Sequence, residues 1–466
     1  MSEVSLARED AGHGAEDTTP RASEAPGGQR AQRRSLAAST AGQLLEWYEW
    51  SAYAVFAPFI ALVMFNPANP VSALLSTLAV FAVGFLMRPL GGIVFGAIAD
   101  RKGRKFVLVT TMLTMATASV LIGLLPTYES IGVWASVALL LARVLQGFAH
   151  GGESATANSY VAEIAPRNRR GQWGSFVFVA IFGGSVLAYS LGGAITNTFD
   201  ETFVTEWGWR IPFLLGAVLA LVALYMRRGM AESAVFDETA AEGSGGSEDA
   251  SAVGDDVDSP STPVVQGRSA ARRQLTAIVL IVAMVSGITA AHYTWTSYVS
   301  TYAIVEQGMS PQAAYWATVA AQLVALVALP FWGRLSDVVG RKPVLYGFAV
   351  AMAALQFPLM WLISDRPWTL LLASMIALLI VGASGALLAC VMSEVFPTAQ
   401  RTRNIGLAYS LSVAVFGGSA PYLNQLFNSW DMNWLSNGYV VLLCVVTFFA
   451  VRRLPETRGI DLNAVR

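Results

Sequence analysis

The sequence predicts an all-α membrane protein with twelve transmembrane helices in two six-helix bundles and both termini in the cytoplasm. Three observations support this fold class. Of the 466 residues, 55% are hydrophobic and 13% are charged, whereas soluble domains carry about 25% charged residues. Twelve apolar runs divide the chain, and two loop motifs occur once in each half.

The apolar runs predict the helices, because a membrane helix needs about 20 apolar residues to cross about 30 Å of hydrocarbon. Short segments rich in Gly, Pro or charged residues separate the runs. The runs lie at residues 38–65, 71–99, 106–126, 131–160, 171–198, 208–227, 274–305, 311–334, 343–363, 368–394, 403–427 and 433–452.

Polar segments set the predicted domain boundaries. The first residues are polar and lack an apolar core, which indicates a disordered cytoplasmic tail. The sequence EGSGGSEDASAVGDDVDSPSTP is acidic and rich in Gly, Ser and Pro, as is typical of a flexible linker. We therefore expect a tail (1–35), an N-terminal bundle (36–227), a cytoplasmic linker (228–273), a C-terminal bundle (274–453) and a C-terminal tail (454–466).

The distribution of basic residues predicts the orientation, because Lys and Arg near helix ends stay in the cytoplasm. With both termini and the linker inside, all but four of the 30 Lys and Arg residues lie on the cytoplasmic side. The four are Arg88, Arg143, Arg210 and Arg366. The opposite orientation would place all the others outside, so we reject it.

The two halves repeat the same motifs at matching helices. GAIADRKGRK (96–105) and GRLSDVVGRK (333–342) share the pattern G-x-x-x-D-x-x-G-R-K. VAEIAPRNRR (161–170) and MSEVFPTAQR (392–401) each have Glu, then Pro three residues later, then Arg four residues after that. An internal duplication explains this match. Such repeats suit transporters that rock two bundles about a central site.

Three ionisable residues fall at one depth in the predicted N-terminal bundle. At 1.5 Å per residue, Glu49 lies roughly 16 Å from the inner end of its helix, and Arg88 and Arg143 each lie roughly 18 Å from a membrane face. A charged group in the membrane costs several kcal/mol unless it is paired, hydrated or protonated. Glu49 is therefore expected to be neutralised by an arginine or by a proton. Glu46, one turn nearer the cytoplasm, is expected to support it.

Several motifs together resemble the major facilitator superfamily and, within it, the metabolite:proton symporter family. They are EWYEW (46–50), RPLGG (88–92), GAIADRKGRK, ARVLQGFAHGGE (142–153), VAEIAP, WGWRIPF (207–213), RRGMAESAVF (227–236) and LPET (454–457). ARVLQGFAHGGE, HYTWTSYVSTY (292–302) and GLAYSLSVAVFGGSAPYL (406–423) are more similar to 2-oxoglutarate permeases than to proline/betaine transporters. The family pattern has Asp where this chain has Glu49, and His150 is an unusual neighbour of the Gly-Gly-Glu sequence.

The resemblance implies roles for the central residues. Sugar porters of the superfamily carry an acid on the first helix and an arginine on the fourth, which matches Glu49 and Arg143, so these two residues and Glu46 are the predicted proton-coupling groups. Arg88 would then grip a substrate carboxylate. The alternatives are a static salt bridge for the pair and a packing role for Arg88. His150 and His292 could titrate, although unclustered histidines are more often hydrogen-bonded structural residues.

Aromatic residues on the first and seventh predicted helices complete the predicted substrate site, since both helices line the cavity in this superfamily. Tyr hydroxyls could donate to a carboxylate, whereas aromatic faces could hold a quaternary ammonium group. Plain packing is the alternative for at least half of them. The predicted substrate-binding residues are Arg88, Tyr48, Tyr53, Tyr293, Trp295 and Tyr298.

The repeated loops resemble the latch that holds the inner gate of the family closed. Asp100, at the end of its helix, is expected to face the N-terminus of the eleventh helix, where the helix dipole favours an anion. The alternative is that these basic residues only fix topology. The predicted gating residues are Asp100, Arg101, Arg104, Glu163, Arg170, Asp337, Arg341, Glu394 and Arg401.

The resemblance implies a transporter of the bacterial inner membrane and not an enzyme. We expect it to import a small organic acid, 2-oxoglutarate or a similar dicarboxylate, with protons by alternating access. An importer of a compatible solute such as proline, betaine or ectoine is the near alternative, and a proton-antiport exporter is a third. No cofactor, metal site or nucleic-acid partner is expected. The expected partners are the solute, protons and the lipid bilayer, and the expected state is a monomer.

Overall fold

The computed structural model describes residues 26–102, 104–151, 161, 165–227, 264–397 and 400–462. For residues 26–41, 99–101, 104, 105, 108, 223, 225–227 and 264–271, the backbone alone is described. Every regular element in these ranges is a helix. All contacts discussed below lie within one compact unit, Ser39–Arg466.

Each of the twelve predicted apolar runs is helical over most of its described residues. Before residue 228 the helices are α1 (Pro26–Met64), α2 (Pro70–Leu86), α3 (Arg88–Lys102), α4 (Arg104–Leu124), α5 (Tyr128–Ile131), α6 (Val133–His150), η1 (Arg167–Arg169), α8 (Arg170–Thr198), α9 (Glu201–Glu206), η2 (Gly208–Arg210) and α10 (Ile211–Arg227). After residue 263 they are α12 (Val264–Tyr293), η3 (Thr294–Tyr298), α13 (Val299–Val305), α14 (Pro311–Val339), α15 (Arg341–Leu362), α16 (Pro367–Gly385), α17 (Leu388–Val395), α18 (Arg401–Ser412), η5 (Val413–Gly417), α19 (Ser419–Ser429) and α20 (Asn433–Arg453).

Eight helical segments of the described residues are long and apolar enough to cross a membrane. Two further apolar helices, Val109–Leu124 and Gly208–Val222, are shorter. Large apolar side chains on these helices face outward, among them Phe331 and Trp361, as expected for a surface in contact with lipid. The chain is therefore an all-helical, multi-pass membrane protein.

Two predicted boundaries differ from the structure. Helix α1 begins at Pro26, inside the predicted tail, and α12 begins at Val264, inside the predicted linker. Both extensions contain Gln, Arg and Ala, which are good helix formers, so a helix already nucleated by an apolar segment continues into them. The remainder of the predicted tail (1–25) and of the predicted linker (228–263) lies outside the described residues.

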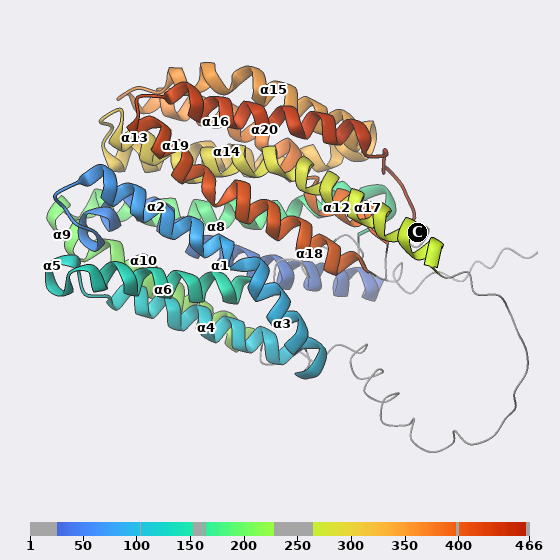
Figure 1. Cartoon of the computed structure of the whole chain (residues 1–466), viewed down its shortest axis with the longest axis horizontal. Coiled ribbons are helices and arrows are strands. Elements are labelled where there is room, and N and C mark those ends of the chain that lie inside the picture. Colours follow the sequence, from blue (N-terminus) through green and yellow to red (C-terminus); the bar gives the residue numbers. More distant parts are fainter. Residues whose placement is uncertain are drawn as a thin grey trace, which may run out of the picture. The chain divides into compact units, whose positions relative to one another are not determined.

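The helices before residue 228 meet those after residue 263 along two seams (Figure 1). Helix α8 packs along α14, and α2 with α3 packs against α18, η5 and α19. The first seam depends on glycine, because a Cβ on Gly333 would lie 2.5 Å from the carbonyl oxygen of Gly171. The backbones of α8 and α14 thus touch, as small residues permit in membrane helices.

Replacing Gly333 with Ala is expected to separate α8 from α14, because a Cβ cannot occupy that space without moving backbone. We expect a loss of about 1–3 kcal/mol in stability and a transport rate reduced by about tenfold or more. Gly347→Ala is the matched control, since that helical glycine has open space at its Cβ position. The two variants are compared by thermal melting in detergent and by uptake. Equal behaviour of the two variants would contradict this account of the seam.

The helices of the second half contain two π-helical turns. Thr294–Tyr298 interrupts the run of α12 and α13, and Val413–Gly417 interrupts that of α18 and α19. The two turns lie close to each other's helices, because η5 packs on α12 and η3 on α19. Such turns bend a helix locally and redirect its side chains. They set the wall of the site described next.

Candidate functional site

A helix break places Arg88 in the middle of the protein. Helix α2 ends at Leu86 and α3 begins at Arg88, with Pro89 in its first turn. A proline lacks the N–H that a continuous helix needs, so the break falls at the preceding residues. Arg88 is 3% exposed.

Glycine contacts bring α2 and α3 against α6 and so set the distance between the two central arginines. A Cβ on Gly84 would lie 3.3 Å from the carbonyl oxygen of Arg143 and 2.9 Å from the ring of Trp50. Gly91 likewise touches the backbone of Phe148. These contacts leave room for Trp50 between Arg88 and Arg143. The guanidinium carbons lie 4.5 Å and 4.6 Å from its ring centre.

Gln146 joins Glu49 to Arg143. Arg143 Nη1 donates to Gln146 Oε1 at 2.5 Å, and Gln146 Nε2 donates to Glu49 Oε2 at 3.0 Å. The same amide also donates to Ser119 Oγ at 2.8 Å. Among the described residues no ion pair within 4.0 Å joins the acid to the arginine directly. The predicted pair is thus a three-residue chain, in which both charged members are buried.

Glu46 lies beside Arg88 and His150. Its Oε1 is 3.6 Å from Arg88 Nη2 and 3.4 Å from His150 Nδ1, and its Oε2 accepts from Gln43 Nε2 at 3.1 Å. His150 Nε2 lies 4.0 Å from Glu49 Oε2. Two acids, two arginines and one histidine therefore form a single buried cluster on α1, α3 and α6.

Arg88 also faces the second half of the chain. Its guanidinium lies over Phe85, at 4.3 Å, and near Trp47, at 5.6 Å. The ring of Tyr293, on α12, packs against both of these side chains, with ring centres 5.2 Å and 6.0 Å apart. The charge of Arg88 acts on the hydroxyls of Tyr293 and of Tyr409, on α18. This place, where α1, α2, α12 and α18 converge, is the candidate substrate site.

Donor groups at the candidate substrate site lack a hydrogen-bond partner among the described residues, although Arg88 Nη2 lies 3.6 Å from Glu46 Oε1. Arg88 Nε and Nη2 and the Tyr293 hydroxyl are buried and make no hydrogen bond in the structure. Buried polar groups are normally hydrogen-bonded, so such exceptions call for a ligand, a water or a change of conformation. Positively charged N–H groups beside a hydroxyl are donors suited to a carboxylate.

The other predicted substrate residues already have partners. The Tyr48 hydroxyl donates to Pro212 O at 2.9 Å and the Tyr53 hydroxyl to Thr77 O at 3.0 Å. Trp295 Nε1 donates to Gln356 Oε1 at 2.9 Å, and the Tyr298 hydroxyl to Gln425 Oε1 at 2.9 Å. Each bond stays within one half of the chain, so only Tyr293 among the predicted aromatic residues offers a polar group to the substrate site.

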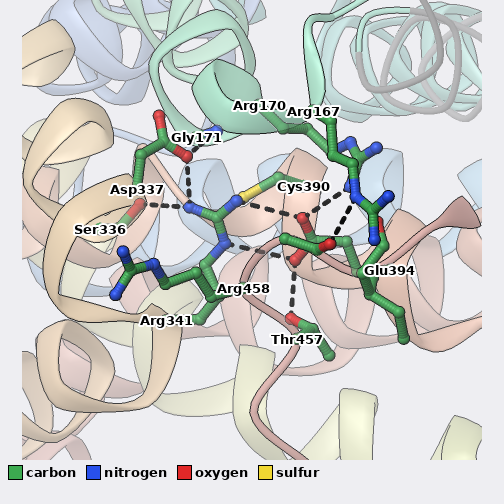
Figure 2. A network of polar contacts seen from close by, with 12 residues as sticks. Arg167, Arg170, Gly171, Ser336, Asp337, Arg341, Cys390, Glu394, Thr457 and Arg458 are labelled. Atoms are coloured by element: carbon green, nitrogen blue, oxygen red, sulfur yellow. Dashed lines mark hydrogen bonds and ion pairs between the residues drawn. The ribbon is translucent and has the colours of Figure 1, made fainter.

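A second site, which we call the polar junction, joins the two halves and comprises Arg170, Asp337, Arg341, Glu394 and Thr457 (Figure 2). Glu394 accepts from Arg170 Nη1 at 3.1 Å, from Arg341 Nη2 at 3.1 Å and from the Thr457 hydroxyl at 2.6 Å. Because Arg170 belongs to α8 and the others follow residue 263, the buried carboxylate of Glu394 ties the halves together.

Asp337 caps a helix of the opposite half. Its carboxylate accepts from the backbone N–H groups of Gly171 and Gln172 at 2.8 Å and 2.9 Å, and from Arg341 Nη1 at 2.7 Å. The N-terminus of α8 is thus occupied by the acid of the second loop repeat, as the helix dipole favours. This is the arrangement expected for Asp100 at the eleventh helix, seen here in the duplicated half.

The remaining predicted gating residues are only partly described. Arg401 Nε donates to Ser393 O at 2.9 Å, and its Nη2 donates to Leu462 O at 2.9 Å. The side chains of Asp100, Arg101 and Arg104, and the whole of Glu163, lie outside the described residues. Their roles stay predictions.

The segment after α20 folds back over the polar junction. Glu456 accepts from the backbone N–H groups of Arg341 and Lys342 at 2.9 Å and 3.0 Å, and so caps the N-terminus of α15. Gly459 O and Ile460 O accept from Arg167 and Arg170 at 2.6 Å and 3.1 Å. The LPET sequence, taken above as a mark of resemblance, is thus a structural part of the junction.

The carboxylate of Glu456 is expected to make the stability of the fold depend on pH. Burial raises its pKa, but hydrogen bonds from four backbone N–H groups outweigh burial and hold the pKa below its usual value. A carboxylate with a lowered pKa stabilises the fold above its unfolded pKa, and the effect is lost as the pH falls through the folded value. Glu456→Gln should therefore cost about 1 kcal/mol or less at pH 7, because the side chain is largely exposed.

Thermal melting in detergent at pH 7 and below about pH 4 measures this effect. The melting temperatures of Glu456→Gln and the wild type should converge at the lower pH. Glu129→Gln is the same chemical change at an exposed residue of α5, and its melting temperature should equal that of the wild type at both pH values. If the melting temperature of Glu456→Gln stays below that of the wild type by the same amount at low pH, the carboxylate of Glu456 does not stabilise the fold in this way.

Sequence reasoning missed Gln146, Ser119 and Thr457. A signal was present for Gln146, since a large polar side chain one turn from Arg143 in an apolar helix needs a partner. The role of Thr457 had no such signal, because it depends on the path of the chain after α20.

The comparisons with known proteins agree with this architecture. Residues 35–466 match the family described as Sugar (and other) transporter. The alpha-ketoglutarate permease of Escherichia coli is 34% identical over 416 residues, covering 89% of this chain and 91% of the permease. The ectoine/proline transporter ProP of Corynebacterium glutamicum is 34% identical over 437 residues, covering 91% and 84%. The citrate-proton symporter of Klebsiella pneumoniae is 31% identical over 373 residues, covering 78% of each chain.

Solved structures share the fold. The major facilitator superfamily proton:xylose symporter XylE bound to 6-bromo-6-deoxy-D-glucose matches with a TM-score of 0.73 and 19% identity, covering 94% of this chain and 98% of that one. A partially occluded inward-open structure of XylE from E. coli matches with a TM-score of 0.70 and 21% identity, covering 91% and 98%. The chain therefore belongs to the Sugar (and other) transporter family, has the major facilitator superfamily fold, and is an organic-solute transporter rather than an enzyme.

Proposed function

We propose that the protein is a proton-coupled symporter of the bacterial inner membrane that imports a small carboxylate-bearing solute by alternating access. Its twelve helices form an N-terminal bundle (36–227) and a C-terminal bundle (274–453), with both termini and the linker (228–273) in the cytoplasm. The repeated loop motifs and the positive charge of the predicted inner loops support this arrangement. The working unit is a monomer in the lipid bilayer.

The observation that carries the substrate class is the set of donors at Arg88 and Tyr293. Both residues are buried where the two bundles meet, and both have donor groups without a hydrogen-bond partner. An arginine fork binds a carboxylate through two N–H groups, and a phenol adds a third donor. Alpha-ketoglutarate, citrate, proline and ectoine, which name several relatives, all carry a carboxylate.

The first choice of solute is 2-oxoglutarate or a similar dicarboxylate. The cationic fork of Arg88 is the charged donor at the site, and a dicarboxylate offers it a stronger anionic partner than a zwitterion with no net charge does. The alternative is a compatible solute such as proline, betaine or ectoine. The faces of Trp47 and Tyr293, tilted by 34° with their ring centres 6.0 Å apart, favour it, because they could hold a quaternary or iminium cation beside the carboxylate site.

Proton coupling is assigned to Glu49, Gln146 and Arg143, with Glu46 in support. When the chain of hydrogen bonds is intact, Arg143 neutralises Glu49 through Gln146. When a helix movement breaks the chain, the buried carboxylate loses that partner and takes a proton instead. The exchange of an arginine for a proton thereby links conformation to the proton gradient.

Gating is assigned to the polar junction and to its counterpart built from Asp100, Arg101, Arg104 and Glu163. The junction fastens α8 to α14 through Asp337 and α8 to α17 through Glu394 in the described conformation. At the opposite end of α14, Tyr315 donates to Val55 O at 2.6 Å, so α1 and α14 also touch there. Opening toward either side of the membrane requires one of these two sets of contacts to break.

Uptake into proteoliposomes tests the function. An inside-negative, inside-alkaline gradient should drive accumulation of the solute, and the solute should acidify the lumen. Unlabelled dicarboxylates, monocarboxylates, betaines and aromatic acids are compared as competitors. Stronger competition by betaines or proline would select the compatible-solute alternative. Efflux stimulated by the opposite proton gradient, without accumulation, would replace symport by antiport.

A further inference from the structure

His150 stands between the two acids of α1. It is the last residue of α6 and is 1% exposed. Its Nδ1 lies 3.4 Å from Glu46 Oε1, and its Nε2 lies 4.0 Å from Glu49 Oε2. Neither nitrogen makes a hydrogen bond in the structure. Nδ1 is thus already near hydrogen-bond distance of Glu46, whereas Nε2 and Glu49 must approach by about 1 Å to reach it.

The packing around the ring holds this orientation. The Trp50 ring lies 5.5 Å from the imidazole at an angle of 49°, and Trp50 is itself held between Arg88 and Arg143. Gly151 follows at a point where a Cβ would strike the backbone of α3, so the end of α6 is fixed against Arg88 and Gly92. The backbone at the end of α6 is therefore fixed beside α3, and the ring that follows from it packs on Trp50 with one nitrogen toward each acid.

The charged groups around the ring come from three helices. Glu46 and Glu49 face it from α1, Arg88 acts on it from α3, and Arg143 acts on it from its own helix. From α4 the nearby polar group is the neutral Ser119, which hydrogen-bonds Gln146. Among the described residues two acids and two arginines face the ring, so with one proton on the acids the cluster carries one positive charge, and this charge is the same before and after the proton passes through the ring.

We propose that His150 carries protons between Glu49 and Glu46, a role that rests on the proposed symport. In one transfer, protonated Glu49 gives its proton to Nε2, and Nδ1–H gives its proton to the Glu46 carboxylate. Glu49 ends as a carboxylate, Glu46 as a carboxylic acid, and the imidazole as the other neutral tautomer. The number of protons and the net charge are unchanged. Rotation of the ring or the reverse transfer restores the first tautomer.

A small recess supplies the outlet. It is lined by Gly42, Leu45, Glu46, Glu49, Met112 and Met115, with Ala220 beyond them, and has room for about one water. Both acids line this recess between α1, α4 and α10, away from the substrate site at Tyr293. With the proposed topology, Glu46 is the acid nearer the cytoplasm, so the relay carries protons inward, apart from the solute.

The test compares His150→Gln with the wild type in proteoliposomes. Gln keeps a polar side chain of similar size but cannot take up a proton. We expect accumulation and solute-driven proton entry to fall at least tenfold, while counterflow exchange stays within about twofold. His13→Gln, the same chemical change outside the described residues, should leave all three unchanged.

The outcomes separate this inference from the proposed function. If the wild type accumulates no solute in response to a proton gradient, the symport proposal itself fails. If the wild type accumulates solute and His150→Gln does so to the same level with the same pH profile, the relay is wrong and symport stands.

If His150→Gln fails to fold, the tautomer of His150 in other variants tests the relay. The chain has three histidines, so ¹⁵N-histidine labelling gives few resonances. Glu49→Gln should shift the His150 tautomer toward Nδ1–H, facing Glu46, and Glu46→Gln should shift it toward Nε2–H, facing Glu49. His150 resonances that respond to neither change would overturn the proposal.

Discussion

Glu49→Gln is expected to abolish concentrative uptake and to leave counterflow exchange largely intact. Glutamine keeps the shape of the side chain and can still meet the amide of Gln146, but it neither carries a charge nor takes a proton. The variant resembles the protonated state permanently. The bundles can still alternate around bound solute, but no proton moves with it. The accumulation ratio should fall to about 1, whereas exchange should stay within severalfold of the wild type.

The measurement is uptake against a pH gradient and, in the same vesicles, exchange of labelled for unlabelled solute. Glu129→Gln is the matched control, because it makes the same chemical change at an exposed residue of α5, away from the cluster. Preserved accumulation in Glu49→Gln would remove Glu49 from the coupling mechanism. Loss of exchange together with a lower melting temperature would instead indicate a static structural role for the Glu49–Gln146–Arg143 chain.

The clustering of the central charges could be predicted from the sequence, but their partners could not. Counting residues along a helix gives the level in the membrane, and Glu49, Arg88 and Arg143 do lie in one buried cluster. The direction in which each side chain points depends on how helices contact one another. Gly84 and Gly91 fix the contact of α2 and α3 with α6. In the resulting arrangement Arg88 pairs with Glu46, and Gln146 lies between Glu49 and Arg143.

The positions of the helices could likewise be predicted from the sequence, but the residues at which they begin and end could not. Apolar length located the membrane helices, because only helices and closed β-barrels satisfy backbone hydrogen bonds in lipid, and a run of about 20 apolar residues has the length that a helix needs. The extensions of α1 and α12 beyond the apolar runs follow local helix propensity, which hydropathy does not measure. The π-helical turns at Thr294 and Val413 carry no sequence signal, since they arise from packing of α12 against the α18–α19 run.

The loop repeats illustrate the value of internal symmetry. The side chain of Asp100 lies outside the described residues, but its repeat, Asp337, caps α8. In the structure Asp337 accepts from two backbone N–H groups and an arginine. A motif match identifies the position, and the number of donors around it decides how much the contact contributes.

Arg88→Lys is expected to weaken solute binding by about 10- to 100-fold. An ammonium group keeps the charge but loses the planar fork, and the loss of one charge-assisted hydrogen bond costs about 1.5–3 kcal/mol. Lysine should still pair with Glu46, so folding should change little. The defect should therefore lie in the apparent KM and in competition binding, with the maximum rate at saturating solute affected less.

Arg366→Lys is the control, because Arg366 is exposed in the loop before α16 and lies far along the chain from the site. Tyr293→Phe completes a double-mutant cycle, since it removes the hydroxyl without changing the ring that packs on Trp47 and Phe85. If both groups hold one carboxylate, the two losses should not add. Strict additivity would mean that the groups act on different parts of the solute. Normal affinity in Arg88→Lys would reduce Arg88 to a packing partner of Trp50 and a counter-ion of Glu46.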